Sequence, residues 1–295
     1  MSGWPPRRAD GHKGQFGTVG VVGGEDSTGS MMVGAPALAA HAALRAGCGR
    51  VVLAAPRSMM GSVLALCPSA TGRPLPQVNT GEVDSCSAGV SIAAMEQDVH
   101  AIAFGPGIGQ SKGAAAMLAH LLSGEGPALV VDADGIRLAP LHQRRSSERP
   151  LIVTPHPGEF RVLATAYGIP EPSTDESSRT RAAMGLANAI DAIVVLKGHH
   201  TVVASTEQTW TCQTGGVELA IPGSGDVLTG IIASLLAQQW AATGAVLPFD
   251  AARLGVQTHA QAGRAWRANH GDRGLLAMEL ADCVPQAVGC DDGID

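Results

Sequence analysis

The sequence predicts a single α/β domain with a mostly parallel central sheet flanked by helices. Strand-like and helix-like apolar patterns alternate from about residue 17 to residue 270, and no linker separates them. Glycine is abundant, with 38 residues, and aromatic residues make up only 3% of the chain, which is typical of many tight loops. Hydrophobic residues form 45% of the chain, enough for a buried core.

The predicted strands are short apolar runs that end in glycine or polar residues. They cover 18–22, 50–54, 100–104, 128–131, 151–153 and 193–196, with a final hairpin or strand pair at 201–204 and 209–212. The predicted helices cover about 35–46, 112–122, 225–239 and 250–268. Gly47 and Gly49 end the first helix, and its many alanines indicate close packing on the sheet. Residues 68–97 have little periodicity, and no element is assigned to them.

Five loops directly after predicted strands contain residues that suit a ligand site. They are Gly23-Gly24, Gly105–Gly109, Asp132–Gly135, Thr154–Glu159 and Lys197–Thr201. In open α/β sheets ligands bind at the carboxyl ends of the strands, so these loops predict one shared cleft along one sheet edge. Glycine and aspartate are also the usual residues of turns, so any single loop has a purely structural alternative.

The stretch Gly223-Ser224-Gly225-Asp226 leads directly into an apolar helix. Its glycines allow a ligand to come close, and the first amides of a helix have no internal partners, which favours an anion site. A carboxylate at such a site would repel phosphate unless it serves the chemistry, for example by taking a proton from a hydroxyl. The alternative is that Asp226 is an ordinary first-turn residue favoured by the helix dipole.

The composition argues against several other functions and sets the expected boundaries. The formal net charge is −6 and no basic cluster is larger than a pair such as Arg144-Arg145, which argues against a nucleic-acid surface. The six cysteines have no CxxC spacing, so a reducing cytoplasm is the expected compartment. No signal peptide or membrane-spanning run is visible. We expect an N-terminal extension at 1–12, the domain at 13–282 and an acidic C-terminal tail at 283–295.

Taken in order, these motifs resemble the ribokinase-like family and, more narrowly, the ADP- or ATP-dependent NAD(P)H-hydrate dehydratases. The matching stretches lie between about residues 12 and 280: His12–Gly17, Gly34–Gly47, Gly105–Gly109, Val131–Asp134, Thr154–Glu159, Lys197–Thr201 and Gly223–Gly230. Gly-Ser-Gly-Asp also occurs in sugar and vitamin kinases. Thr-Pro-His-Pro-Gly-Glu following Val-Asp-Ala-Asp is more specific, and it favours the dehydratases.

The resemblance implies a repair reaction on hydrated NADH and NADPH. The family phosphorylates the ring hydroxyl of the S epimer with ADP in bacterial members or ATP in eukaryotic ones, and then expels phosphate to restore the double bond. We expect ADP here because the chain looks like the stand-alone bacterial type, although no residue distinguishes the two nucleotides. Mg²⁺ is expected because phosphoryl transfer usually needs a divalent ion.

Mapped onto this sequence, the resemblance implies that Asp226 is the general base that deprotonates the ring hydroxyl. It implies four further groups of contacts. The amides of Gly223, Ser224 and Gly225 would form an anion hole for the phosphoryl group. Contacts to the hydrated dinucleotide would come from Ala35, Gly107, His156 and Asp226. Contacts to the nucleotide would come from Lys197, Gly198, His199, His200, Thr201 and Gly225. No metal ligand is assigned.

Some of these residues have a structural alternative. His156 lies between two prolines, where it could cap the next helix, and Glu159 stands where a first-turn carboxylate is common. Asp132 and Asp134 lie near the phosphates and metal in the family, but here they could also cap the short helix that follows. For the two histidines at 199 and 200, the backbone is expected to matter more than the rings.

The segment before the glycine turn departs from the family pattern. Gly216 stands in place of an asparagine, and Glu218 in place of a small residue. Ile221 and Pro222 stand in place of a lysine and a glycine. Losing a cation and gaining a carboxylate near a polyphosphate should weaken nucleotide binding, and proline removes a backbone donor. Val33 also replaces a common threonine.

Two other functions stay open. A small-molecule kinase acting on a vitamin precursor would keep Asp226 and the anion hole but release a phosphorylated product, and the Thr154–Glu159 loop argues against it. A nucleotide-binding protein without turnover is favoured by Glu218 and Pro222. Because some relatives are fused to an epimerase, the resemblance also implies a separate NAD(P)H-hydrate epimerase as partner. The alanine-rich helices favour a homo-oligomer.

Overall fold

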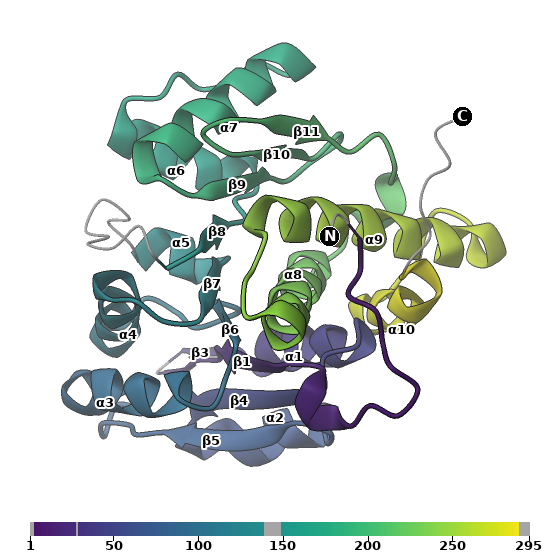
Figure 1. The fold of residues 1–295 in the computed structure, drawn as a ribbon. Coiled ribbons are helices and arrows are strands. Elements are labelled where there is room, and N and C mark those ends of the chain that lie inside the picture. The colour runs from purple at the N-terminus through teal and green to yellow at the C-terminus, as the bar shows by residue number, and fades with distance from the viewer. Residues whose placement is uncertain (1–2, 28, 139–148, 289–295) are drawn as a thin grey trace.

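The computed structural model describes residues 3–27, 29–138 and 149–288, and within these residues the main sheet has nine strands in the order β11-β10-β9-β8-β7-β6-β1-β4-β5 (Figure 1). All neighbours from β9 to β5 pair in parallel. At the other edge β10 is antiparallel to both β9 and β11. The predicted mostly parallel sheet and the terminal hairpin are therefore confirmed.

The strands are short because each is an apolar run bounded by loop residues. Their bounds are β1 Thr18–Val22, β4 Arg50–Pro56, β5 Thr71–Leu75, β6 Ala101–Phe104, β7 Ala128–Val131, β8 Leu151–Val153, β9 Ile193–Leu196, β10 Val202–Ala204 and β11 Thr209–Thr211. The bounds of β1, β7, β8 and β9 match the predicted ones. A separate small hairpin of β2 (Asp26–Ser27) and β3 (Ser30–Met31) follows β1.

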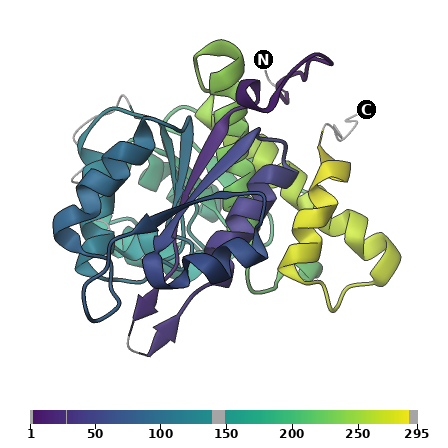
Figure 2. The ribbon, with the colours of Figure 1, turned by 90° about the horizontal axis from the view of Figure 1, so that it is seen from below.

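Helices cover both faces of the sheet, and each set encloses its own apolar core (Figure 2). One face carries α1 (Gly34–Arg45), α2 (Met60–Leu66), α8 (Ser224–Thr243), α9 (Pro248–His270) and α10 (Ala277–Ala287). The other carries α3 (Ser85–Glu96), α4 (Lys112–Ser123), α5 (Asp134–Leu138), α6 (Pro157–Tyr167) and α7 (Glu176–Ile190). Short 3₁₀ turns are η1 (Lys13–Gln15), η2 (Arg57–Met59) and η4 (Val217–Leu219). This two-sided arrangement explains why the strands of the inner sheet are buried apolar runs.

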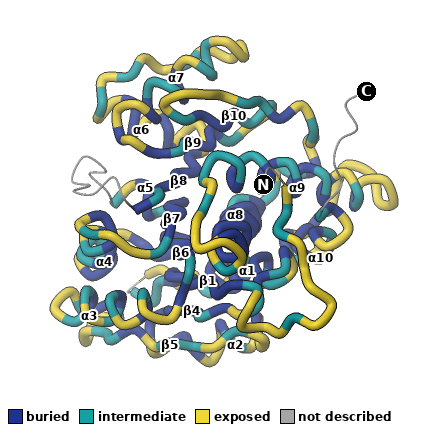
Figure 3. The backbone as a smooth tube through the Cα atoms, in the orientation of Figure 1, coloured by how far each residue is buried: buried dark blue, intermediate teal, exposed yellow. Residues whose placement is uncertain are grey.

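Helix α8 is the most deeply enclosed helix near the predicted site. Every residue from Val227 to Gln239 is buried, and the helix shows as a dark blue segment in Figure 3. Helix α1 packs closely against it, because a Cβ at Gly230 would collide with the carbonyl oxygen of Ala39. Glycine is thus required where the two helices meet. The close packing holds the N-terminus of α8 at the carboxyl edge of the sheet.

The order of the strands reverses between β1 and β6. After β1 the chain adds β4 and β5 on one side and then returns to place β6 on the other side. The loops after β1 and β6 meet there: the amide of Gly24 donates to the carbonyl of Pro106 at 3.0 Å. Ligands of open α/β sheets bind in the crevice at such a switch point.

The domain boundaries near the two chain ends and the cytoplasmic location remain predictions from the sequence. The boundaries at 12, 13, 282 and 283 have no structural test, although residues 283–287 lie within α10. Arg144-Arg145 and residues 289–295 lie outside the described residues. Among the described helices, none combines the length and apolar character needed to span a membrane. The cysteines of the described part, 48, 67, 86, 212 and 283, are all free thiols.

Candidate functional site

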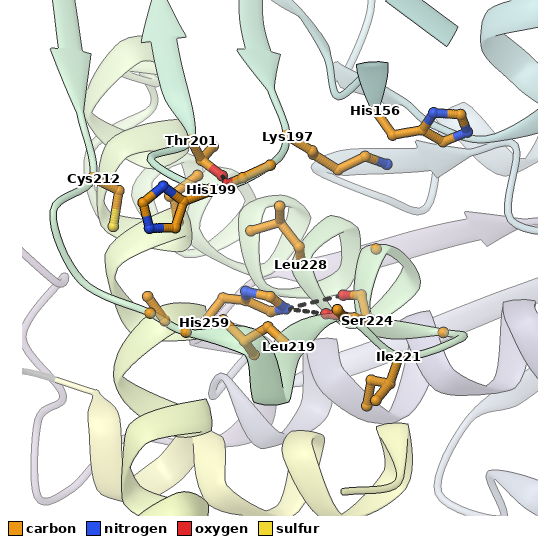
Figure 4. Close-up of a pocket in the computed structure, with 18 of the residues that line it drawn as sticks. His156, Lys197, His199, Thr201, Cys212, Leu219, Ile221, Ser224, Leu228 and His259 are labelled. Atoms are coloured by element: carbon orange, nitrogen blue, oxygen red, sulfur yellow. Dashed lines mark hydrogen bonds between the residues drawn. The ribbon is translucent and has the colours of Figure 1, made fainter. Parts of the chain in front are cut away.

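A pocket of about 800 Å³ opens beyond the carboxyl ends of β7, β8 and β9 (Figure 4). The lining residues with carboxylate, ammonium or imidazole side chains are Asp132, His156, Glu159, Lys197, His199, His200, Asp226 and His259. The large apolar lining residues are Val217, Leu219, Ile221, Leu228 and Val256. A cavity of this size and mixed lining suits a small organic ligand with a charged part.

Most of the predicted site residues meet in this pocket. They are His156, Lys197, Gly198, His199, His200, Thr201, Gly223, Ser224, Gly225 and Asp226. Ala35 and Gly107 do not line it. They lie together at the switch point, where a Cβ on Gly107 would be 3.2 Å from the Cβ of Ala35. The predicted site residues therefore fall in two neighbouring regions, the pocket and the switch point.

The switch-point region adjoins the pocket through two loops. The amide of Gly109 donates to Oδ2 of Asp134 at 3.2 Å. A Cβ on Gly105 would collide with the carbonyl oxygen of Asp132, which itself lines the pocket. The loop after β6 is therefore packed directly on the loop after β7, and a ligand in one region would be next to a ligand in the other.

Lys197 is held in the pocket by a buried carboxylate. Its Nζ lies 2.6 Å from Oδ1 of Asp132, while Thr229 donates to Oδ2 at 2.7 Å. Burial opposes the charge on Asp132, but the charge and hydrogen bond of Lys197 and the bonds from Thr229 and Thr154 outweigh it, so the pKa of this carboxyl is lowered. The pKa of Lys197 is raised, because Asp132 and Glu159 outweigh its burial. The pair is therefore ionised, and the side chain of Asp132 does not cap a helix.

His156 combines the two roles that the sequence left open. It is the N-cap of α6, and its Nδ1 accepts from the amides of Gly158 and Glu159 at 2.9 and 3.3 Å. The Glu159 carboxylate completes the capping box by accepting from the amide of His156 at 2.8 Å. Because Nδ1 accepts, Nε2 is the protonated nitrogen, and it faces Glu159 at 3.2 Å. The ring nevertheless lines the pocket.

Asp226 lies in the first turn of α8 and faces this charged group. Burial raises the pKa of Asp226 to about 8, and the negative charges of Asp132, Asp134 and Glu159 act in the same direction, against the charge of Lys197. A carboxylate accepts protons most effectively when its pKa is close to the operating pH. The site therefore contains a carboxyl that can act as a base at neutral to alkaline pH.

The start of α8 forms a second electrostatic feature of the pocket. Gly223 is its N-cap with φ of 85°, and a Cβ there would lie 2.8 Å from Cδ1 of Leu38 and 2.9 Å from Cβ of Ala277. Glycine has no side chain to cap the first amides. The Ser224 amide makes a long bond of 3.4 Å to the carbonyl of Ile221, so the amide of Gly225 is the more available donor. Nζ of Lys197 lies 3.2 Å from the place of a Cβ on Gly225. A cation and a helix N-terminus thus act on the same space, which favours an anion.

Sequence reasoning missed His259, a buried residue of α9 in the pocket wall. Its Nε2 lies 3.0 Å from both Oγ and the carbonyl oxygen of Ser224, as the dashed lines in Figure 4 show. Burial lowers the pKa of His259 to about 4. His259 lies in the predicted helix at 250–268, and 35 positions separate it from Ser224. No local signal shows which helix its ring will contact.

The segment from Gly216 to Pro222 forms part of the wall, but Glu218 itself does not line the pocket. Its carboxylate is fully buried, lies 3.6 Å from Nη1 of Arg267 and is close to Gly263 of α9. Of the residues that depart from the family pattern, Gly216, Ile221 and Pro222 do line the pocket. Glu218 therefore makes no contact with the ligand space, although its carboxylate lies directly behind Gly216, whereas apolar Ile221 lines that space.

The residues of the pocket suit a Mg²⁺ ion that would take most of its coordinating oxygens from the nucleotide phosphates and water. Among the described residues no three His, Cys, Asp or Glu side chains form a metal-binding group. Asp132 is engaged by Lys197 and Thr229, and Glu159 by the amide of His156. Mg²⁺ normally keeps several waters and binds through phosphates with one or two carboxylates. Asp134 accepts from the amide of Gly109 and does not line the pocket, so Asp226 is the lining carboxylate left for the ion, and the nucleotide phosphates would supply its other ligands.

Comparison with known proteins agrees with this geometry. Residues 19–286 match the model of a family described as NAD(P)H-hydrate dehydratase. An ADP-dependent (S)-NAD(P)H-hydrate dehydratase of Neisseria meningitidis is 36% identical over 93% of this chain and 86% of its own length. A solved ADP/ATP-dependent NAD(P)H-hydrate dehydratase of Bacillus subtilis, co-crystallised with ATP and Mg²⁺, is 28% identical. That structure has a TM-score of 0.74 and covers 97% of this chain and 94% of its own.

Some relatives are longer than this chain. A bifunctional NAD(P)H-hydrate repair enzyme of Moorella thermoacetica is 34% identical over 95% of this chain but only 51% of its own length. The chain thus spans about half the length of the bifunctional relatives it matches.

Proposed function

Because the chain belongs to the NAD(P)H-hydrate dehydratase family, we propose that it uses ADP to dehydrate the S epimer of hydrated NADH and NADPH. The products are NAD(P)H, AMP and inorganic phosphate. One observation carries the proposal: Asp226, with a pKa of about 8, stands in the first turn of α8 beside the Lys197–Asp132 pair. A proton acceptor and an anion site are thus adjacent, as phosphoryl transfer from a nucleotide to a hydroxyl requires.

The two neighbouring regions divide between the two substrates. ADP occupies the pocket along Lys197–Thr201, with its terminal phosphate at Gly223–Gly225 and its adenosine against the apolar lining residues. The hydrated ring approaches from the switch point, past Ala35 and Gly107, with His156 on the pocket side. Asp226 lies where these regions meet, so it can reach the ring hydroxyl as the terminal phosphate comes into line.

In the first step Asp226 takes the proton of the ring hydroxyl while the oxygen attacks the terminal phosphorus of ADP. The P–O bond to the leaving AMP breaks, and negative charge on the transferring group is stabilised by the amides of Ser224 and Gly225 and by Lys197. Because Asp132 holds the ammonium in place, little reorganisation is needed as this charge develops.

In the second step the phosphate ester leaves with the electron pair of the C–O bond. Water takes a proton from the neighbouring ring carbon, and the electron pair of that C–H bond restores the ring double bond. Protonated Asp226 can return its proton to the departing phosphate, which readies the carboxylate for another cycle. Mg²⁺, carried in with the nucleotide, supplies charge neutralisation for the phosphates when it is bound.

A separate NAD(P)H-hydrate epimerase would supply the S epimer, because the bifunctional repair enzymes among the relatives combine two activities on the same metabolite. Free thiols among the described cysteines suit a reducing cytoplasm. The alanine-rich helices are compatible with a homo-oligomer, which sedimentation of the purified protein would test.

A nucleotide-binding protein without turnover is the second candidate. Ile221 and Pro222 stand in the pocket wall in place of the cation and glycine of the family pattern, so nucleotide phosphates meet a less favourable surface. Such a protein would bind ADP without forming NADH. A vitamin-precursor kinase has less support, since the Thr154–Glu159 loop follows the dehydratase pattern.

The decisive experiment is recovery of absorbance at 340 nm from purified hydrated NADH, with ADP and then with ATP. The wild-type chain is compared with Asp226→Asn. Recovery that requires a nucleotide and is lost in the variant supports the dehydratase and names its nucleotide. If absorbance stays flat with both nucleotides while calorimetry shows that one of them binds, the dehydratase assignment is wrong and the non-catalytic candidate replaces it.

A further inference from the structure

The imidazole of His259 reaches from α9 to the first residue of α8. Its Nε2 lies 3.0 Å from Oγ of Ser224 and 3.0 Å from the carbonyl oxygen of the same residue. His259 is 9% exposed and Ser224 is 8% exposed, so water has little access to the contact. Both residues line the pocket, and Figure 4 shows the two hydrogen bonds in its wall.

The positions of the hydrogens follow from the chemistry of the partners. A carbonyl oxygen can only accept, so Nε2 of His259 must carry the hydrogen. Burial keeps the ring neutral at physiological pH, because the pKa of His259 lies at about 4. The single N–H is shared between the carbonyl and the hydroxyl of Ser224, as in other three-centre hydrogen bonds. The Ser224 hydroxyl therefore accepts from His259, and its own hydrogen is left for another acceptor.

Ser224 lies beside the position proposed for the phosphoryl group. It is the first residue of α8, it follows Gly223, and it precedes Asp226 by two positions. The other nearby hydroxyl of this helix, on Thr229, is already bonded to Asp132. An oriented hydroxyl at the first residue of α8 would be a further donor to the oxygens that the backbone amides bind.

We propose that His259 is a positioning residue that orients the Ser224 hydroxyl and carbonyl, so that the hydroxyl donates to the phosphoryl group during transfer. The inference rests on the proposed function, because it assigns a task within that reaction. It identifies Nε2, and not Nδ1, as the ring nitrogen that matters. It also makes the Ser224 side chain, beyond the backbone amide, part of the anion hole.

Three variants separate positioning from packing. His259→Gln places an amide nitrogen near the position of Nε2, His259→Asn places one near Nδ1, and His259→Leu keeps an apolar filling. We expect kcat for NADH formation to fall about 10- to 100-fold in His259→Leu and His259→Asn, on the scale of a weakened oxyanion donor. His259→Gln should retain most of the wild-type kcat. ADP binding by calorimetry should change less than about threefold in all three, because the nucleotide keeps its other contacts.

A double-variant comparison tests the route through Ser224. Ser224→Ala should lower kcat by a similar factor, and adding His259→Leu to it should cause little further loss. The inference is overturned if His259→Leu keeps the wild-type kcat, if His259→Gln is no better than His259→Asn, or if the two losses multiply. The Gln and Asn pair still decides the matter if His259→Leu does not fold, which thermal unfolding reports. A wild-type chain that forms no NADH overturns the proposed function and this inference together, whereas an active wild type isolates the inference.

Discussion

The ammonium of Lys197 lies 2.6 Å from Oδ1 of Asp132, so it is fixed before any nucleotide arrives. Asp132 is 1% exposed, and its other oxygen accepts from Thr229. The pair lies beside Gly225 at the start of α8, so the direction of the cation is set by buried contacts and not by the ligand. Such preorganisation favours charge stabilisation in a transition state.

Removing the cation should therefore destabilise the fold as well as the reaction. Lys197→Met leaves the Asp132 carboxylate buried without its partner, and we expect a loss of about 3–5 kcal/mol in the free energy of unfolding. Adding Asp132→Asn should recover part of that stability without restoring activity. Urea unfolding of the single and double variants measures both effects. If the double variant is as unstable as the sum of the two singles, the pair is not coupled.

Asp226→Asn should remove activity while stabilising the protein. Loss of the base is expected to lower kcat about 10²–10⁴-fold. The pKa of Asp226 is about 8 in the folded state and near 3.8 in the unfolded chain. Between these pH values the unfolded chain loses the proton while the folded chain keeps it, so the free energy of unfolding falls as pH rises. At pH 8 the variant should be more stable by roughly 5 kcal/mol, as the difference between the two pKa values implies, with almost no gain near pH 4.

A matched carboxylate with the opposite shift serves as the control for Asp226. Hydrogen bonds from Ser173 and from the Ser178 amide and Ser177 lower the pKa of Asp175 to about 2. Asp175→Asn should therefore give no stability gain at pH 8. Thermal unfolding at pH 4 and pH 8 distinguishes the two sites, and an equal response of both variants would contradict the shift of Asp226.

The rate should increase with pH because the base must be ionised. Below pH 8 we expect kcat/KM to fall about tenfold for each unit of pH, with an apparent pKa near 8. The Asp134 charge helps to raise this pKa, so Asp134→Asn should move the midpoint to lower pH. Asp250→Asn, at the start of α9, is the control. A midpoint that does not move in Asp134→Asn would speak against the electrostatic coupling.

The two unusual residues before the glycine turn should have different effects on nucleotide binding. Ile221 lines the pocket, so Ile221→Lys should lower KM for ADP by roughly 3- to 10-fold at low salt, through attraction to the phosphates. Glu218 does not line the pocket and is paired with Arg267, so Glu218→Gln should leave that KM within about twofold. Steady-state kinetics at two salt concentrations test both changes. A gain that persists unchanged at high salt would argue against a charge effect.

Because α1 and α8 are closely packed, a larger residue between them should lower the free energy of unfolding. Gly230→Ala forces a methyl group into the carbonyl of Ala39, and we expect a loss of about 1–3 kcal/mol of stability. Gly61 is the control: it lies in α2 with no atom within 4 Å of an added Cβ. Gly61→Ala should stabilise by about 0.4–1 kcal/mol. Chemical denaturation of the two variants should therefore give opposite shifts.

Sequence patterns located most strands because apolar runs with sharp ends leave little ambiguity. The exceptions have identifiable causes. β5 contains Pro74 and lies at the sheet edge, where its residues are mostly part-exposed, so no clear run is visible. In α3 the buried positions Ala88, Ile92 and Met95 follow a helical spacing, but Val90 is 73% exposed and blurs the period. Neither element has the local signal that pattern analysis needs.

The candidate site divides in the same way. Lys197 and Asp226 could be found from the sequence, because each lies in a loop or turn that has its own pattern of glycine and polar residues. The bond from His259 to Ser224 could not, since it depends on how α9 packs against α8. The orientation of Glu218 was likewise invisible, because a sequence does not say which way a wall residue turns.

The burial of α8 separates two kinds of evolutionary freedom. Its residues from Val227 to Gln239 are enclosed by the core, so a substitution there is screened by folding itself. Of the wall residues, Ile221 is half-buried against the edge of that core and Pro222 is exposed, so changes there alter the nucleotide site at a smaller cost to the fold. A lineage of this fold can thus adapt its phosphate donor while inheriting the same reaction centre unchanged.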